Sequence, residues 1–131
     1  MIERTSREFT INTDEGEYDL SASVRQIGRD LLVAIWGGDR PHIGAVAMSQ
    51  PRPSLKDPEV TSSTASVFTY VGHKEDELAK AAAEILAATL KTNVVVAAGI
   101  HWDNLPPEAI QRVIRNSEIL VDMILTKIVG E

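Results

Sequence analysis

The sequence predicts an α+β fold in which an antiparallel-rich sheet of about six strands packs against two long helices. Two observations support this class. Short runs that alternate apolar and polar side chains fill the first 70 residues, as half-buried strands do. Two longer segments then repeat apolar side chains at helical spacing, with a short apolar run between them. At 131 residues the chain has the length of one domain, and we expect residues 1–131 to form it.

Composition narrows the class of protein. Apolar residues make up 44% and charged residues 24% of the chain, which is the balance of a globular domain with its own core. There is no cysteine, so thiol nucleophiles and disulfides are excluded, and a reducing cytoplasm is a suitable compartment. A net charge of −6 disfavours nucleic acid as a partner. The N-terminus lacks a secretory signal and no apolar run approaches the roughly 20 residues of a membrane span, so we expect a soluble, cytoplasmic protein.

The first strands follow from alternation. Residues 7–12 place Phe9 and Ile11 on one face, and residues 18–24 continue the same period after a turn at Gly16. Gly28, Arg29 and Asp30 then predict a tight hairpin. The strand that follows, 31–36, is apolar at successive positions, as expected of a central strand covered on both faces.

The middle of the chain predicts two more strands separated by a long connection. Residues 43–50 form a small-residue strand, and residues 64–71 are rich in β-branched and aromatic side chains. Between them, residues 49–63 contain three of the six prolines and show little periodicity. We therefore expect a long loop there, and such loops are often functional.

The last third predicts helix, strand and helix. Residues 75–91 begin with three acids, which suit the positive end of a helix dipole, residues 94–98 form an interior strand, and a proline-started helix runs from about 106 to 128. The expected buried stripes are Leu78, Ala82, Ile85, Leu86, Thr89 and Leu90 in the first helix, and Ile110, Val113, Ile114, Leu120, Ile124 and Ile128 in the second.

All three histidines lie at predicted strand ends. His42 lies in "GGDRPHIGAVA", His73 in "YVGHKEDEL" and His101 in "AGIHWDNLPP". Each has a glycine within two residues and an aspartate within three. Glycine allows close backbone approach, so these corners could be shaped around a ligand or around one another.

The residues alone leave several kinds of site open. A zinc or iron site could combine His42, His73 and His101 with Asp39 or Asp103, although no HxH or HExxH spacing supports it. The third corner could instead hold a histidine and aspartate as an acid–base pair. A purely structural role is the third possibility, in which polar residues of the corners close turns.

Two further interpretations of the corners are that Trp102 covers the core and that basic residues bind an anion. Trp102 could cover an exposed edge of the core. An anion site could use Arg40, Arg52 and Lys74 with the helix start, but the three acids at residues 75–77 oppose it. The glycine-rich stretches match neither GxGxxG nor a phosphate loop, and no GxSxG motif is present.

Taken together, "GGDRPHIGAVAM", "TSSTASVFTYVGHKEDELA" and "VVVAAGIHWDNLPPEAI" resemble the LpdD-like, prenylated-flavin chaperone-like family, whose fold is similar to that of proteasome assembly chaperones. The likeness covers residues 36–110. It implies a non-catalytic accessory protein of a UbiD-type decarboxylase large subunit that uses prenylated FMN and acts on aromatic acids such as gallate. Cofactor loading or maturation, transient binding of prenylated FMN or FMN and a homodimer are also implied. We expect no resident metal.

The resemblance implies a recognition surface at the three corners, in which glycines allow close approach and histidine or asparagine contacts a flavin edge or a partner loop. A small metal-dependent enzyme and a structural scaffold remain the alternatives. The loop 49–60 is a second candidate for partner contact. The candidate residues are Gly38, Asp39, Pro41, His42, Gly44, Gly72, His73, Lys74, Gly99, His101, Asp103 and Asn104.

Overall fold

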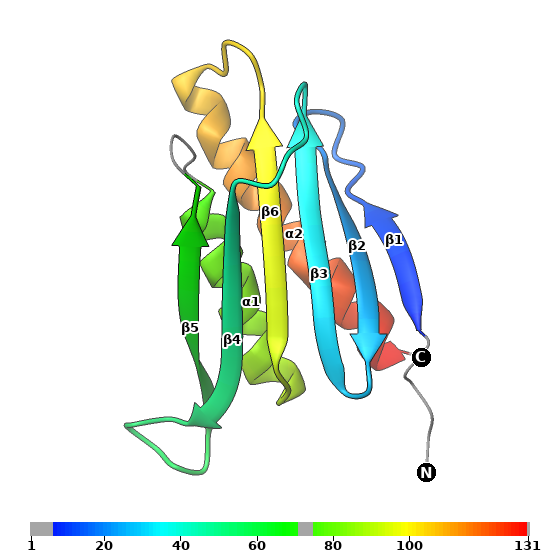
Figure 1. Cartoon of the computed structure of the whole chain (residues 1–131). Coiled ribbons are helices and arrows are strands. Elements are labelled where there is room, and N and C mark those ends of the chain that lie inside the picture. The colour runs from blue at the N-terminus through cyan, green and yellow to red at the C-terminus, as the bar shows by residue number, and fades with distance from the viewer. Residues whose placement is uncertain (1–6, 71–74, 131) are drawn as a thin grey trace.

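A computed structural model describes residues 7–70 and 75–130 and confirms the predicted α+β class. Six strands form one sheet in the order β1-β2-β3-β6-β4-β5, and both long helices cover the same face of it (Figure 1). The central pair, β3 and β6, is parallel, and every other neighbouring pair is antiparallel. The elements are β1 (Glu8–Asn12), β2 (Leu20–Ile27), β3 (Asp30–Gly38), β4 (Ala45–Pro53), β5 (Thr61–Thr69), α1 (Asp76–Leu90), β6 (Val94–His101), η1 (Pro107–Ala109) and α2 (Ile110–Gly130).

The N-terminal strands form the predicted antiparallel arrangement. β2 and β3 are joined by a two-residue turn whose Gly28 has a φ of 63°, a left-handed conformation that glycine adopts without strain. Alternate residues of both strands, such as Val24 and Val33, are fully buried beneath the helices. The predicted hairpin is therefore confirmed.

The predicted loop at 49–63 is wrong for most of its length. β4 continues to Pro53 and β5 already begins at Thr61, so the connection is only residues 54–60. β4 pairs with β6 from Ala45 to Ser49, and from there onward its ladder is with β5 alone. A proline such as Pro51 lacks an N–H, and a strand that is paired on one side tolerates this loss.

β6 is longer than the predicted strand 94–98. It runs in parallel register with β3 from Leu31 opposite Val94 to Gly38 opposite His101. Because the two strands end together, the residues that follow each of them leave the sheet at the same edge. His101 is therefore the last residue of a strand and not the first of a loop.

Helix α1 lies within the predicted segment 75–91, but its buried stripe differs from the prediction. The buried side chains are mostly alanines, which let the helix lie close to β4 and β5. Ile85, which the spacing assigned to the core, is 46% exposed. Lys91 caps the helix after Leu90: it adopts a left-handed conformation, and its N–H donates to the Ala87 carbonyl.

The predicted stripe of α2 is correct in its second half and wrong in its first. Leu120, Ile124 and Ile128 are buried against the sheet, but Ile110 and Ile114 are 47% and 43% exposed. Figure 1 shows the reason, because the first turns of α2 extend past the ends of β4 and β5. Apolar spacing identifies one helix face, but it does not tell where the covering sheet ends.

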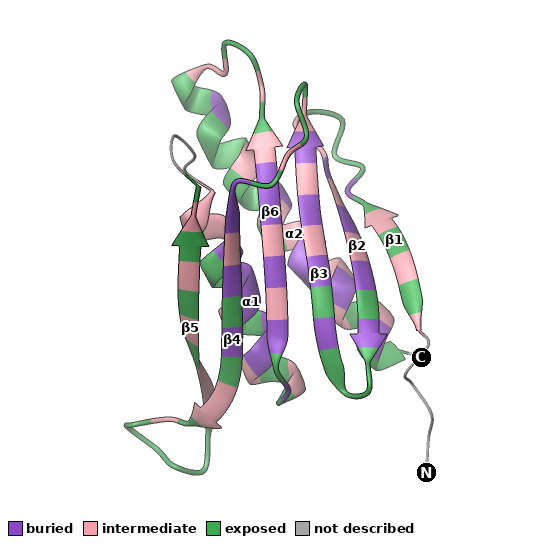
Figure 2. Cartoon of the chain, viewed as in Figure 1, coloured by how far each residue is buried: buried purple, intermediate pink, exposed green. Residues whose placement is uncertain are grey.

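The core lies between the sheet and the helices. Burial alternates along the strands, and the outward-facing positions of the same strands are intermediate or exposed (Figure 2). One side of the sheet is therefore packed and the other is open. Within residues 7–70 and 75–130, no helix is long and apolar enough to cross a membrane.

Candidate functional site

Two of the three predicted corners meet at the edge where β3 and β6 end. The Asp39 N–H donates to the His101 carbonyl over 2.7 Å, and the Asp103 N–H donates to Asp39 Oδ2 over 2.9 Å. The loops that follow the two parallel strands are thus tied to each other by their own polar groups.

The glycines of these corners let chain segments approach one another. A Cβ added at Gly38 would lie 2.0 Å from the His101 carbonyl oxygen, and one at Gly99 would lie 1.5 Å from the His42 carbonyl oxygen. Both distances are far inside van der Waals contact. The sequence left open whether these glycines make room for a ligand or for contact between the corners. Among the described residues, they make room for contact between the corners.

His42 joins the first corner to helix α1. Its Nε2 lies 2.7 Å from Glu75 Oε2, and its Nδ1 lies 2.8 Å from the Arg40 carbonyl oxygen. Gly44 makes room for this pair, since a Cβ there would lie 1.7 Å from Glu75 Oε2. Both side chains are mostly buried, with exposed fractions of 23% for His42 and 12% for Glu75.

These contacts raise the pKa of His42. The Arg40 carbonyl has the largest effect because it only accepts hydrogen bonds and so fixes a proton on Nδ1. Burial opposes the charged ring, and the hydrogen bond and negative charge of Glu75 favour it. A ring with acceptors at both nitrogens favours the imidazolium, which forms an ion pair with Glu75 at the rim when the ring is protonated.

The third corner holds the other described histidine in a more exposed pair. His101 Nε2 lies 3.1 Å from Asp103 Oδ1, and the Arg40 guanidinium lies 3.4 Å from the same oxygen. The two side chains of the histidine pair are 46% and 47% exposed. The predicted acid–base geometry is present, but water screens it and Arg40 shares the carboxylate.

Trp102 covers the end of the core, as predicted. Its ring packs edge-on against Tyr18, with centroids 5.2 Å apart and an interplanar angle of 79°, and it contacts the buried cluster. Asn104 follows with a φ of 57°, which closes the turn before η1. The corner therefore has a structural role alongside any binding role.

A cleft of about 710 Å³ opens between α1, α2 and the end of β6, beside the two corners. Sequence analysis missed it because its apolar walls were assigned to the core. His42, His101, Glu75, Glu77, Glu118 and Ser117 supply its polar lining. The apolar lining consists of Leu78, Ala81, Ile85, Ile100, Trp102, Leu105, Ile110, Val113 and Ile114.

Part of the predicted site lies elsewhere or outside the described residues. Gly72, His73 and Lys74 fall within 71–74 and are not described, although Glu75 next to them contacts the first corner. Pro41 is exposed in the loop after β3. Within 7–70 and 75–130, no group of three or more histidine, aspartate and glutamate side chains could hold a metal ion. The proposed metal set that includes His73 extends beyond these residues.

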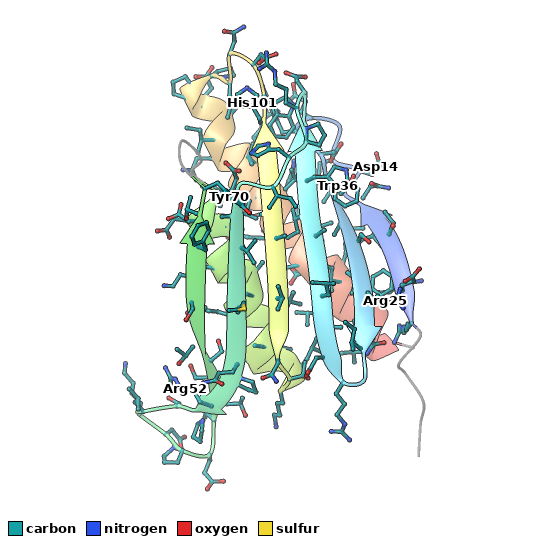
Figure 3. The ribbon with its side chains drawn as sticks, in the orientation of Figure 1. Asp14, Arg25, Trp36, Arg52, Tyr70 and His101 are labelled. Atoms are coloured by element: carbon teal, nitrogen blue, oxygen red, sulfur yellow. The ribbon has the colours of Figure 1, made fainter. Side chains whose placement is uncertain are left out.

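The anion site built from Arg40, Arg52 and the helix start is wrong in its geometry. Arg52 lies near the end of β4, where its Nε donates to Thr64 Oγ1 over 2.6 Å. Figure 3 shows Arg52 and His101 at opposite ends of the molecule. The two arginines therefore cannot act on one anion.

The fold and the cleft together define a small α+β protein with an apolar cleft beside the ends of β3 and β6, and a comparison with solved structures gives the same fold. The structure is similar to a chain of "a Novel Chaperone Complex for Yeast 20S Proteasome Assembly", with a TM-score of 0.57 and 11% identity over 91% of this chain and 96% of that one. At this identity the likeness concerns the fold. The predicted resemblance to the fold of proteasome assembly chaperones is confirmed.

The family is shown by sequence. The prenylated flavin chaperone LpdD-like domain matches residues 14–129, so the chain belongs to this family. It is also 29% identical over 105 residues to Protein LpdD of Lactiplantibacillus plantarum, a match that covers 73% of this chain and 67% of that protein. The family resemblance predicted from the three motif blocks is confirmed, and the family supports a chaperone role.

The lining of the cleft suits the ring system of a prenylated flavin better than it suits the phosphate. Such a group combines a flat, largely apolar ring system with a charged phosphate. The apolar walls and Trp102 suit the ring, and the volume is in the range of small-molecule sites. Among the described lining residues there are three glutamates and two histidines, but no lysine or arginine, so the lining offers the phosphate little attraction.

Proposed function

We propose that this protein is a non-catalytic chaperone that holds a prenylated flavin transiently and assists its loading into a decarboxylase. The single observation that carries the proposal is the apolar cleft beside the two joined corners, in a chain of the prenylated flavin chaperone family. The ring system would lie against Trp102 and the isoleucines of both helices. His42 and His101 would contact its polar edge at the rim.

The uneven fit supports a carrier role. A site that must release its ligand to another protein benefits from a weak hold on the part that the next protein binds. The three acids of the lining, Glu75, Glu77 and Glu118, leave a phosphate at the outer end of the cleft, free for a second protein to bind. The candidate residues of the corners act in this proposal as positioning and rim groups, with no catalytic residue among them.

The proposed recipient is a UbiD-type decarboxylase large subunit that uses prenylated FMN and acts on aromatic acids of the gallate type. The chaperone would act as a homodimer in the cytoplasm, a compartment that the absence of cysteine suits. Support for this partner comes from the family alone. The cofactor's chemistry would take place on the decarboxylase.

Flavin binding and transfer test the proposal with one matched pair of variants. Ile85→Glu adds a carboxylate to the wall of the cleft, and Leu55→Glu adds the same charge in the exposed loop 54–60. We expect Ile85→Glu to weaken binding of FMN about tenfold or more, which corresponds to about 1.4 kcal/mol. Leu55→Glu should bind FMN as the parent protein does. Quenching of flavin and tryptophan fluorescence measures the affinity.

The transfer step is measured by activation of an apo-decarboxylase with prenylated FMN in the presence of each variant. The parent protein should speed activation, and Ile85→Glu should not. Equal activation with and without the parent protein would contradict the chaperone role. Equal FMN affinity of the two variants would contradict the cleft as its site.

A further inference from the structure

A buried asparagine interrupts the apolar face of α2. Asn116 is 4% exposed and lies one turn before Leu120. A buried amide is costly unless its polar atoms are hydrogen-bonded. Its Nδ2 donates to the Glu17 carbonyl over 2.8 Å and to the Tyr18 carbonyl over 2.7 Å, so each amide proton has an acceptor. The asparagine therefore ties α2 to the segment 13–19, which connects β1 and β2.

These two hydrogen bonds fix the backbone on both sides of Tyr18. The Glu17 and Tyr18 carbonyls belong to the two peptide groups that flank the Tyr18 Cα, and both accept from one side chain. Tyr18 has a φ of 57°, a left-handed conformation that is unfavourable for a residue with a Cβ. Because this conformation needs support from outside the segment, we assign its support to Asn116.

The rest of the segment 13–19 is closed by its own polar groups. The Asp19 carboxylate accepts hydrogen bonds of 2.7, 2.8 and 3.0 Å from within the segment. The donors are Thr13 Oγ1, the Glu15 N–H and the Gly16 N–H. Arg112 of α2 forms an ion pair with Glu17 as a second link to the helix. The segment is thus one folded unit, and α2 holds it.

The Tyr18 ring in turn supports Trp102. The two rings pack edge-on with centroids 5.2 Å apart. The Trp102 ring also lies close to Gly37 of β3, where an added Cβ would be 2.6 Å from Leu20 Cδ2 and 3.5 Å from Trp102 Cη2. Trp102 lines the cleft, but Tyr18 and Asn116 are not among the residues that line it. They act on the cleft wall from behind.

We propose that Asn116 and Tyr18 are positioning residues of the flavin site, which set the place of the Trp102 ring in the cleft wall. The inference rests on the proposed function, since it gives these residues a role toward the flavin ring system. A flat ring system gains from an aromatic wall only when that wall is held at a suitable distance and angle. A wall that is held before the ligand arrives also loses less freedom on binding.

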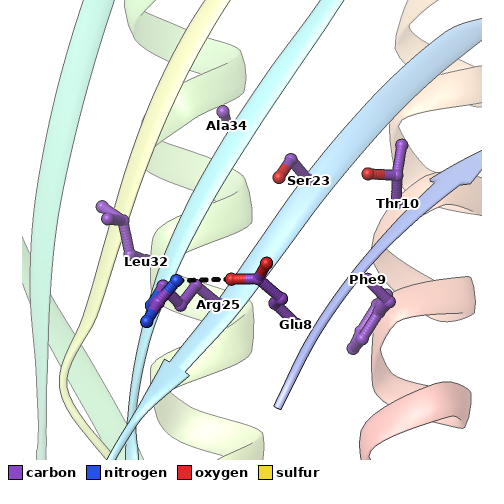
Figure 4. Close-up of a pocket in the computed structure, with 7 residues that line it drawn as sticks. All are labelled: Glu8, Phe9, Thr10, Ser23, Arg25, Leu32 and Ala34. Carbon is purple, nitrogen blue, oxygen red and sulfur yellow. Dashed lines mark hydrogen bonds and ion pairs between the residues drawn. The ribbon is translucent and has the colours of Figure 1, made fainter. Parts of the chain in front are cut away.

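Another depression of the molecule provides a control surface. Figure 4 shows it on the open face, over β1, β2 and β3, with a volume of about 370 Å³. Its described lining includes Phe9 but no tryptophan, and it holds the ion pair of Arg25 with Glu8. Trp36 lies on the same outward side of β3 and is the other tryptophan of the chain. Trp36→Phe therefore leaves Trp102 as the only tryptophan without changing the cleft.

Flavin titrations in the Trp36→Phe background test the inference. Tyr18→Leu and Asn116→Leu should each weaken FMN binding about threefold to tenfold, which is the scale of one aromatic pair. Their Trp102 emission should shift to longer wavelength before any flavin is added, because water reaches a ring that has lost its support. Tyr18→Phe keeps the ring, so it should retain both the emission and the FMN affinity of the parent protein.

Two control variants separate positioning from general stability. Thr92 is also buried, and its hydroxyl lies 2.7 Å from the Asp30 carboxylate, just before the start of β6. Thr92→Val should lower the free energy of unfolding, as Asn116→Leu does, but leave FMN affinity and the Trp102 emission unchanged. Ser23→Glu places a carboxylate in the depression of Figure 4 and should also leave both unchanged.

A double variant tests whether the two positioning residues act through one another. Because Asn116 acts on Trp102 through Tyr18, the variant with both leucines should bind FMN no more weakly than the weaker of the single variants. A fully additive double variant would overturn the inference. Loss of FMN binding in Thr92→Val as large as that in Asn116→Leu would also overturn it, because the effect would then be one of stability.

Failure of the inference and failure of the proposed function give different results. A parent protein without measurable FMN affinity would overturn the proposed function and, with it, the role of the two residues toward flavin. A parent protein that binds FMN, together with Tyr18→Leu of equal affinity and unchanged Trp102 emission, would overturn the inference alone.

Discussion

A single histidine links the two parts of the candidate site. His42 bonds the Arg40 carbonyl with one ring nitrogen and Glu75 with the other, so it fixes the loop before β4 to the start of α1. Because both partners are acceptors, the link is strongest when the ring is protonated. The charge state of His42 therefore controls how firmly the rim of the cleft is held.

The sign of this linkage predicts a pH dependence of stability. The folded state raises the pKa of His42 above 6.5, first through the Arg40 carbonyl and then through Glu75. The stabilisation is therefore complete below about pH 6.5, and it is lost as pH rises through the folded pKa. We expect Glu75→Gln to lower the pKa of His42 and to make this loss smaller, because the negative charge that favours the imidazolium is removed.

The measurement is an NMR titration of the His42 ring, together with urea unfolding between about pH 5.5 and 8.5. Glu77→Gln is the matched control. Glu77 lines the same cleft from the same helix, and it is not one of the hydrogen-bond partners of His42 described above. A His42 pKa that is unchanged by Glu75→Gln, or lowered equally by Glu77→Gln, would show that the ion pair does not have this role.

At the level of residues, the sequence predicted the corners but not their contacts. The histidines, glycines and aspartates stand out because they follow apolar runs, and that local pattern placed His101 correctly at a strand end, whereas His42 lies in the loop between β3 and β4. It did not indicate that Gly99 faces the His42 carbonyl or that Glu75 reaches His42. Those contacts join segments that are more than 30 residues apart. The pairing of β6 with both β3 and β4 brings His42 to Gly99, and the packing of α1 on the sheet brings Glu75 to His42.

At the level of elements, helical spacing found both helices but misjudged what covers them. The apolar stripe of α2 continues along its whole length, and the stripe of α1 includes Ile85. The sheet covers α2 only from about its third turn. The apolar side chains in the second half of α2 are therefore buried in the core, and those in its first half line the cleft. The same limit explains the missed extension of β4, since proline is tolerated wherever a strand is paired on one side.

Helix α2 offers a matched test of which apolar side chains belong to the core and which to the cleft wall. Ile124 is fully buried and Ile114 is 43% exposed in the cleft, and both lie on α2. We expect Ile124→Ala to lower the free energy of unfolding by about 2–5 kcal/mol, because it leaves a cavity in the core. Ile114→Ala should cost less than about 1 kcal/mol, because solvent already reaches that side chain. Urea unfolding measures both, and equal losses would mean that the cleft is part of the closed core.

At the level of the whole molecule, the sheet separates two surfaces. The cleft lies on the helix side, and the exposed apolar side chains of Met48, Phe68 and Tyr70 lie on the open side, with the strands between them. The fold and the family could be predicted from the sequence, because hydrophobic periodicity and the three motif blocks can be recognised without coordinates. The two surfaces could not be predicted from the sequence. Hydrophobic periodicity assigns their residues to a buried face, but it does not tell what covers that face.

Separation by the sheet predicts that the two surfaces act independently. Phe68→Glu adds a carboxylate to the open face and should leave FMN affinity within about a factor of two, because additivity holds for sites that share no contacts. Ile85→Glu should weaken FMN binding, and the double variant should weaken it to the same extent as Ile85→Glu alone. Flavin fluorescence measures all three variants. If Phe68→Glu abolished FMN binding while the protein stayed folded, the flavin site would extend beyond the cleft of one chain.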